Sequence, residues 1–153
     1  MSNQFEIDTS EVEKMFSEFD GRKRKAVYRR ATKDALNIVK KETLQNLKGE
    51  INPKMFSKKD KWGNSFRTGV VVKVGKSGKT GVIHIMKNFK LRFYELGTQY
   101  RYHKNGRYIG RIRKTRFFTR AKQSKEREVF NSINRLISDS IKRINEKYNN
   151  RKL

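Results

Sequence analysis

The chain has 153 residues, a length typical of one domain. Its 39 Lys and Arg against 15 Asp and Glu give a formal net charge of +24 at pH 7, which is more than solubility requires. This excess implies a polyanionic partner, an acidic protein partner, or a place in an assembly beside packaged nucleic acid. The absence of cysteine excludes disulfides and Cys-based zinc sites. No apolar run approaches the roughly 18 residues that span a bilayer, and the acidic N-terminus is unlike a signal peptide, so we expect a chain made in the cytoplasm and not bound to a membrane.

Residues 1–20 form an acidic arm. They hold six acids against one lysine, a net charge of −5, so the remainder of the chain carries +29. Ser10 and Glu13 match a capping box, which predicts a short helix ending at Asp20-Gly21. The apolar face of that helix comprises Val12, Met15, Phe16 and Phe19. The arm either docks on a neighbouring copy or folds back on its own body.

Residues 21–148 are predicted to form a single domain. Apolar residues spaced by three and four predict a helix over 22–47, which Gly49 ends. Residues 50–65 contain the only proline, Pro53, and read as an irregular loop. Valine-rich segments predict strands over 66–74 and 81–86, joined by a turn as a hairpin.

The second half of the domain is predicted to add strands and a long helix. A third strand is expected over 91–98, and Asn105-Gly106 indicates a type I′ turn between a fourth and fifth strand, or in a long protruding hairpin. A helix over 119–148 follows, with residues 149–153 as a frayed tail. Its apolar stripe comprises Val129, Phe130, Ile133, Leu136, Ile137, Ile141, Ile144 and Tyr148. The predicted fold class is α+β, an antiparallel sheet of four to five strands packed by two long helices, with a protruding basic hairpin.

The sequence offers no catalytic or metal-binding pattern. Gly78-Lys79-Thr80 resembles the end of a phosphate-binding loop, but the expected strand after it lacks the loop-to-helix geometry of such sites. His84 and His103 are the only histidines, and no carboxylates cluster with them. No paired carboxylates and no nucleophile with a base are evident. We therefore expect no enzyme, no cofactor and no metal.

A basic and aromatic segment follows residue 98. From Gln99 to Lys122 it carries nine Lys or Arg, five Tyr or Phe, and no acid. Its tyrosines can stack on bases and its cations can meet phosphates, without a motif that reads base sequence. The candidate contact residues are Tyr100, Arg101, Tyr102, Lys104, Arg107, Tyr108, Arg111, Arg113 and Lys114. The alternative is a solvated, flexible loop whose charges bind nothing specific.

Glu95 is the only acid between Asp60 and Glu126. A carboxylate in such a basic setting is expected to pair with Arg or Lys, within the chain or between subunits. Gly97 is expected to supply a backbone conformation that a side chain would forbid, at the end of a strand.

The segments 93–98 and 116–121, followed by an amphipathic helix, resemble the HK97 gp10-like tail-component family of tailed phages and prophages. The motif Glu95-Leu96-Gly97-Thr98 fits the family pattern, as do Phe117, Phe118 and Ala121. Arg116 and Arg120 stand where the pattern has prolines, and residues 63–66 match only loosely. The acidic arm and the long basic hairpin also depart from the pattern.

The resemblance implies a structural subunit of a ring at the head-tail junction, a neck or tail-completion protein located in the virion. Its partners would be other copies of itself in sixfold or twelvefold symmetry, portal or connector and tail proteins, and the DNA that crosses the ring. The alternative is a sequence-independent nucleic-acid-binding protein outside a virion. A small nuclease or RNase toxin is a distant third, which the lack of a catalytic cluster disfavours.

Overall fold

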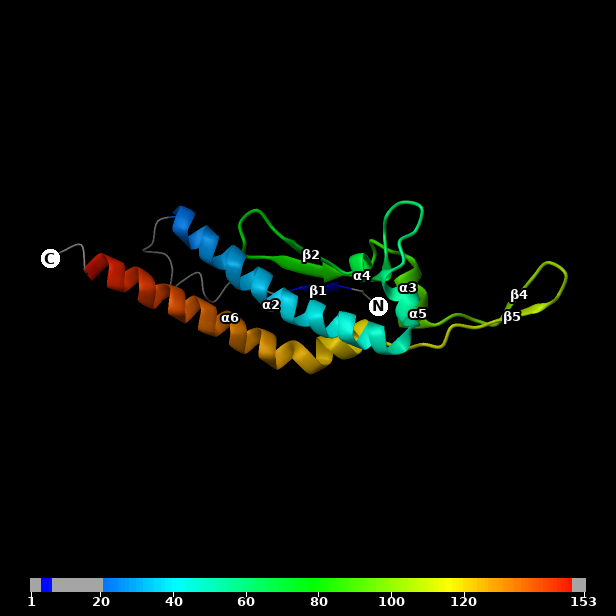
Figure 1. Ribbon diagram of the computed structural model, residues 1–153. Coiled ribbons are helices and arrows are strands. Elements are labelled where there is room, and N and C mark those ends of the chain that lie inside the picture. The colour runs from blue at the N-terminus through cyan, green and yellow to red at the C-terminus, as the bar shows by residue number, and fades with distance from the viewer. Residues whose placement is uncertain (1–3, 7–20, 150–153) are drawn as a thin grey trace.

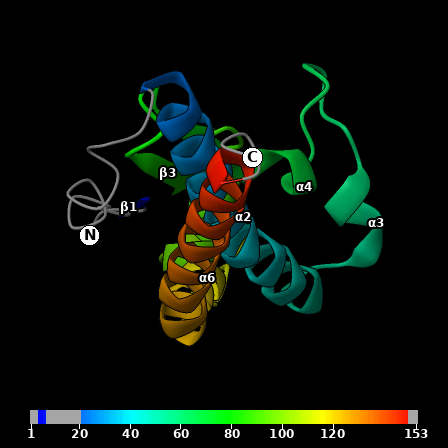
Figure 2. The same ribbon diagram turned by 90° about the vertical axis from the view of Figure 1, so that its left-hand side faces the viewer.

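A computed structural model describes residues 4–6 and 21–149 of the chain. The predicted short helix within residues 10–19 and the tail after residue 149 lie outside these described residues. Two long helices, α2 (Gly21–Glu50) and α6 (Phe117–Asn149), run antiparallel along the length of the molecule (Figure 1). A small sheet covers one side of the pair, and a thin ribbon projects beyond one end (Figures 1 and 2).

Helix α2 forms because small and branched apolar residues recur every three or four positions. Its buried positions line one stripe, while the other faces carry lysine and arginine. The stripe comprises Tyr28, Ala31, Thr32, Ala35, Leu36, Val39, Thr43 and Leu47. The helix agrees with the predicted 22–47, with one more turn that runs past Gly49.

Helix α6 also agrees with its prediction and starts two residues earlier. Val129, Ile133 and Ile137 are buried against α2, as their spacing predicts. Phe130 is an exception, because 49% of it is exposed. It follows Val129 directly and lies about 100° from it around the helix, although Ile137, seven residues on, lies within about 20° of Phe130. The predicted burial of Phe130 is therefore wrong.

The main sheet has three antiparallel strands in the order β1-β3-β2: β1 (Gln4–Glu6), β3 (Gly81–His84) and β2 (Val71–Val74). In the register, Val72 faces Ile83 and Phe5 also faces Ile83 from the other side. Gly81 lies against α2, where a Cβ would come within 2.6 Å of side-chain atoms of Thr32 and Leu36. The hairpin of β2 and β3 is as predicted. The sheet is smaller than the predicted four to five strands.

Two segments predicted as strands are helical instead. Residues 66–69 form a single turn, α4 (Phe66–Gly69), because Ser65 and Thr68 make reciprocal capping bonds. Residues 90–96 form α5 (Lys90–Leu96), which buries Leu91 and Glu95 on one side. A short apolar run in the sequence does not distinguish a strand from a helix, and here the burial of a pair spaced i, i+4 on one side shows that the segment is helical. The predicted loop also contains a turn of helix, α3 (Pro53–Ser57), with Asn52 as its cap and Pro53 in its first turn.

The remaining strands are β4 (Arg101–Tyr102) and β5 (Tyr108–Gly110), and among the described residues they pair only with each other. They form the projecting ribbon and do not extend the main sheet. Within the described part of the chain, no helix is long and apolar enough to cross a membrane.

Candidate functional site

The carboxylate of Glu95 caps the start of α6. Glu95 is 1% exposed. Its Oε2 accepts a hydrogen bond from the Phe118 amide at 2.8 Å, and its Oε1 accepts from the Thr119 amide at 3.0 Å and the Thr119 hydroxyl at 2.6 Å. The first amides of a helix lack partners within the helix and favour a negative charge. Glu95 is thus satisfied by a helix start, and not by an Arg or Lys of the described residues as expected.

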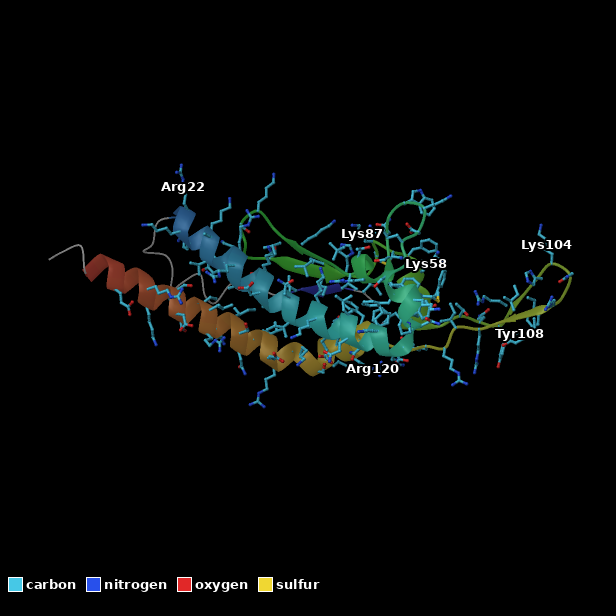
Figure 3. The ribbon with its side chains drawn as sticks, in the orientation of Figure 1. Arg22, Lys58, Lys87, Lys104, Tyr108 and Arg120 are labelled. Carbon is cyan, nitrogen blue, oxygen red and sulfur yellow. The ribbon has the colours of Figure 1, made fainter. Side chains whose placement is uncertain are left out.

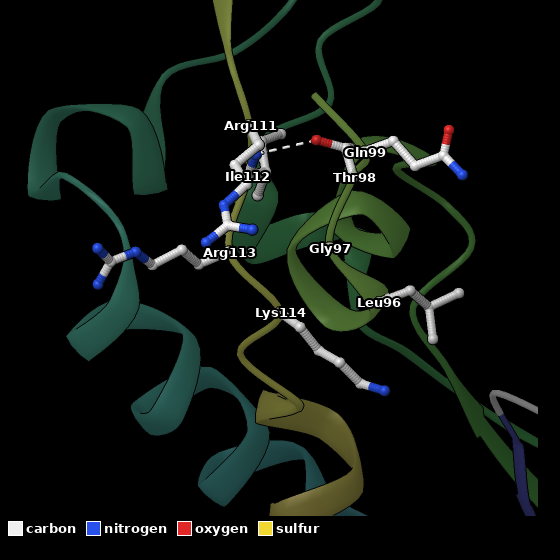
Figure 4. A pocket seen from close by; sticks show the side chains of 8 residues that line it. All are labelled: Leu96, Gly97, Thr98, Gln99, Arg111, Ile112, Arg113 and Lys114. Carbon is white, nitrogen blue, oxygen red and sulfur yellow. Dashed lines mark hydrogen bonds between the residues drawn. The ribbon is translucent and has the colours of Figure 1, made fainter. Parts of the chain in front are cut away.

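Gly97 and Thr98 join α5 to the segment that leads into α6. Gly97 has φ of 76°, and a Cβ on it would lie 3.0 Å from the Lys114 amide nitrogen and 3.2 Å from the Ile112 carbonyl oxygen. The predicted special conformation is confirmed, although it ends a helix and not a strand. The Thr98 amide donates to the Ile112 carbonyl at 3.0 Å, and the Ile112 amide donates to the Thr98 hydroxyl at 2.9 Å (Figure 4).

Further bonds extend this contact toward the helix. The amide and the hydroxyl of Thr115 each donate to the Tyr94 carbonyl at 2.9 Å, and the Arg116 amide donates to the Glu95 carbonyl at 3.2 Å. Residues 94–98 and 112–119 therefore hold one another, and we call them the clasp. The buried rings of Phe117 and Phe118 anchor the clasp in the core.

Arg116 and Arg120 both use backbone features that proline lacks. Arg116 has φ of 51°, the only positive φ among the described residues other than glycine. The Arg120 amide donates to the Arg116 carbonyl at 2.8 Å. Proline fixes φ near −65° and has no amide hydrogen. Proline at either position would therefore require a different start to α6.

Residues 99–111 form the ribbon, which projects from the clasp away from the helix pair (Figures 1 and 3). Residues 99–109 are all exposed. At the tip the Gly106 amide donates to the His103 carbonyl at 2.9 Å, and Gly106 alone of the turn has positive φ, at 80°. A type I′ turn needs positive φ at Asn105 as well. The predicted turn position is confirmed, but its predicted type is wrong.

Three tyrosines of the ribbon gather into one aromatic cluster. The Tyr108 ring lies between the other two, 6.0 Å from Tyr100 and 5.6 Å from Tyr102 between centroids. The Arg111 guanidinium lies 5.0 Å from the Tyr100 ring, within the range of a cation–π contact. Each tyrosine is more than half exposed. The cluster is an open platform that also carries a positive charge.

The other cations of the segment fall into two places. Lys104 and Arg107 lie at the tip of the ribbon. Arg113 and Lys114 lie at its base, where with Arg111 they line a shallow hollow beside Gly97 (Figure 4). Arg101 folds back, with its Nε donating to the Gly110 carbonyl at 3.4 Å. The ribbon therefore brings seven of the predicted contact residues onto one projection, with Arg113 and Lys114 at its base, and spreads their charge along its length.

The two histidines lie in different elements, His84 in β3 and His103 in the ribbon. Burial, and to a smaller extent the nearby Lys73 charge, lower the pKa of His84, whose Nδ1 accepts a bond from the Met86 amide at 3.3 Å. Among the residues that the structure describes, no three His, Cys, Asp or Glu gather where they could hold a metal ion. Gly78-Lys79-Thr80 lies in the turn before β3, as predicted.

One surface was missed at the sequence level. Phe89, Phe93 and Leu96 are exposed by 57%, 41% and 39%, and the two phenylalanine rings stack edge to face at 6.0 Å. Their spacing of i, i+4 and i+7 is the signal of a helix face. It escapes notice when the segment is taken as a strand. We call these three residues the outer stripe of α5.

No protein-family model, no curated protein and no solved structure matches this chain.

Proposed function

We propose that this chain is a structural subunit of a phage or prophage head-tail junction ring. It acts as a neck or tail-completion protein that docks the connector or portal to the tail around the DNA channel. Its mechanism is assembly, and no reaction is required. Its proposed place is the neck of the virion, after synthesis in the host bacterial cytoplasm.

The observation that carries this proposal is the basic ribbon, whose base is held by hydrogen bonds of the clasp. Residues 99–114 carry six Lys or Arg and no acid. The clasp fixes where the ribbon starts, because Thr98 on one side exchanges two hydrogen bonds with Ile112 on the other. A projection that adds nothing to the core but is firmly mounted is suited to contact a second surface. Its charge favours DNA phosphates or acidic protein.

The order of elements supports the same proposal. A long helix, a hairpin, the motif at Glu95–Thr98 and a long final helix follow one another as in the family that the sequence resembles. In this chain the motif has a physical role, since Glu95 caps α6 and Gly97 permits close approach to Lys114.

A second candidate is a sequence-independent nucleic-acid-binding protein outside a virion. The tyrosine cluster favours it, because exposed aromatic rings beside cations bind single strands by stacking. Tyr100, Tyr102 and Tyr108 offer such rings without a base-reading element.

The first test measures assembly. We expect the purified chain to form closed rings with a central opening in negative-stain micrographs. Its native mass should be six or twelve times 18.2 kDa, alone or on isolated connectors. A chain that stays monomeric on connectors, and binds DNA with a steep dependence on salt, contradicts the ring proposal and supports the second candidate.

The second test concerns the ribbon. Replacing Arg101, Lys104, Arg107 and Arg111 with Gln is expected to weaken DNA binding or connector docking at least tenfold without lowering the melting temperature. The matched control replaces four exposed lysines of α2 with Gln: Lys25, Lys33, Lys41 and Lys48. Equal loss in both variants would show that net charge, and not the ribbon, carries the contact. A further variant with Tyr100, Tyr102 and Tyr108 changed to Ser separates stacking on single strands from phosphate contact.

A further inference from the structure

Trp62 is the only tryptophan of the chain, and 69% of it is exposed. It lies between α3 and α4 in residues 58–64, which we call the tryptophan loop. An aromatic side chain of this size normally buries most of its large apolar area. Among the described residues, no second aromatic ring contacts Trp62. The ring therefore adds little to the core, and its exposure points to a ligand outside the domain.

Hydrogen bonds around Asp60 hold the tryptophan loop in one shape. The Oδ1 of Asp60 accepts from the Trp62 amide at 2.9 Å and from the Asn64 amide at 2.8 Å. The Asp60 amide donates to the Asn64 carbonyl at 2.8 Å, and the Gly63 amide donates to the Asp60 carbonyl at 3.0 Å. Gly63 has φ of 76°, which glycine adopts without strain. The loop stands out from the body of the molecule between α3 and α4 (Figure 1).

The surroundings of the Trp62 ring are positively charged. Lys58, Lys59 and Lys61 are exposed in the same loop. The Lys61 Nζ lies 4.3 Å from the centre of the Trp62 ring, within the range of a cation–π contact. The one acid of the loop, Asp60, is already bonded to backbone amides. In the part of the chain that the structure describes, no ion pair neutralises the three lysines.

One ring surrounded by cations favours one class of ligand. A protein interface centres its aromatic anchor in a packed apolar patch, and a lipid surface takes several apolar side chains at once. A single-stranded nucleic acid requires a flat ring for a base and cations for the phosphates. The positive charge of the loop also continues into a hollow, which Lys58 and Lys59 line together with Lys90 at the start of α5.

We propose that the tryptophan loop binds an unpaired base of a single-stranded nucleic acid. The base stacks on the Trp62 ring, while Lys58, Lys59 and Lys61 contact the neighbouring phosphates. Every base has a flat face, so the binding is independent of sequence.

The ribbon provides independent support for this class of ligand. The ribbon and the tryptophan loop stand out from the same end of the molecule, where α3, α4 and α5 lie (Figure 1). Each combines an exposed aromatic ring with a cation beside it, Lys61 on Trp62 and Arg111 on Tyr100. The site on the loop goes beyond both candidate functions, since neither a ring of subunits nor the ribbon requires it.

The test uses the full chain and the fluorescence of Trp62, which reports on this loop alone because the chain has no other tryptophan. An oligothymidylate of about 12 nucleotides, within the usual site size, is expected to quench the emission at low salt as a base stacks on the ring. A duplex of the same length should quench far less, because its bases stack on one another. Equal quenching by the duplex would show phosphate contact without stacking and overturns the inference.

Substitution of the ring gives a second readout. Trp62→Ala is expected to weaken binding of a labelled oligothymidylate about tenfold, measured by fluorescence anisotropy, whereas Trp62→Phe keeps a ring and should retain most of the affinity. The matched control is Phe130→Ala, which removes an exposed ring of α6 and should leave the affinity unchanged. Trp62→Ala should melt at the temperature of the parent chain. A lower melting temperature would place the ring in the fold and overturn the inference.

Substitution of the charges gives a third readout. Lys58→Gln with Lys59→Gln should flatten the plot of log affinity against log salt by about 1.4, since each phosphate contact on a single strand contributes about 0.7. The control is Lys25→Gln with Lys33→Gln, two exposed lysines of α2, which should leave that slope unchanged. Equal flattening in the two variants would assign the binding to net charge and overturn the inference.

The alternative ligands have distinct signatures. A blue shift of the Trp62 emission on phosphatidylglycerol vesicles, without quenching by oligothymidylate, overturns the inference in favour of a lipid surface. Loss of connector docking in Trp62→Ala, again without quenching, overturns it in favour of a protein contact. Oligothymidylate that binds without changing the Trp62 emission lies on the ribbon alone and also overturns it. The variant with Tyr100, Tyr102 and Tyr108 changed to Ser should therefore still show the quenching.

The inference and the proposed function can fail separately. Rings that form on isolated connectors, while oligothymidylate leaves the Trp62 emission unchanged, keep the proposed function and reject the site. Quenching in a chain that stays monomeric on connectors keeps the site and rejects the ring.

Discussion

At the scale of single residues, we expect Glu95 to make a large contribution to the stability of the fold. Its buried carboxylate satisfies two amides and a hydroxyl at the start of α6. We predict that Glu95→Gln lowers the free energy of unfolding by roughly 2–3 kcal/mol, measured by urea denaturation, because bonds to a charged acceptor are lost and a buried amide hydrogen faces the helix donors.

Glu50→Gln is the control for this prediction. Glu50 pairs with Arg120 near the same helix start, but both side chains are at least one third exposed. Ion pairs on the surface contribute about 0–1 kcal/mol, so the free energy of unfolding of this variant should be close to that of the parent chain. Equal losses in the two variants would mean that Glu95 does not act as a cap.

Gly97 is the second residue on which the clasp depends. Gly97→Ala is expected to cost about 2 kcal/mol or more, since positive φ disfavours a side chain and the new Cβ meets Lys114. Gly106→Ala is the comparison, because it has a similar φ of 80° but nothing within 4 Å. Thermal unfolding of both variants separates steric contact from backbone strain. Gly97→Ala with the smaller loss would contradict the described clasp.

At the scale of elements, the packing of α6 on α2 buries one residue of the predicted apolar stripe and leaves another exposed. Ile137 is 3% exposed and Phe130 is 49% exposed. We predict that Ile137→Ala destabilises the protein by about 2–5 kcal/mol. Phe130→Ala should cost less than about 1 kcal/mol, as surface changes usually do. Chemical denaturation of both variants checks the predicted difference, and a costly Phe130→Ala would place that ring in the core.

The elements also show which secondary structure a sequence pattern is sufficient to predict. Helices α2 and α6 were predicted because 30 and 33 residues repeat a helical period many times. The segment over 90–96 is only seven residues long and was predicted as a strand. Its helical form depends on the burial of Leu91 beside Gly69 and of Glu95 at the start of α6, contacts that exist only in the folded chain.

At the scale of the whole molecule, the positively charged side chains outnumber the acidic side chains that could neutralise them. With 39 Lys and Arg against 15 Asp and Glu, folding brings like charges together. We predict that raising NaCl from about 20 to 300 mM raises the melting temperature, because the screening length shortens severalfold. In the variant with Lys25, Lys33, Lys41 and Lys48 changed to Gln, the melting temperature should rise less with the same increase in salt. A melting temperature that falls with salt would show that attractive ion pairs dominate.

The candidate site, too, was predicted from the sequence only in part. The cations and tyrosines of the ribbon were predicted as contact residues because their composition alone indicates a polyanionic partner. The Tyr100, Tyr102 and Tyr108 cluster could not be predicted, since it depends on how two strands pair. The outer stripe of α5 was missed because its exposure depends on which side of a short helix the core covers.

The sequence by itself determined the two long helices, the β2–β3 hairpin, the projecting basic segment and the special backbone at Gly97. Each of these is encoded locally, by a period, a turn signal or a run of charge. Only the tertiary structure decided that Glu95 caps α6, that residues 90–96 are helical and that the ribbon stands apart from the sheet. Those outcomes depend on contacts between residues far apart in the chain, such as Glu95 with Thr119, whose free energy no local pattern contains.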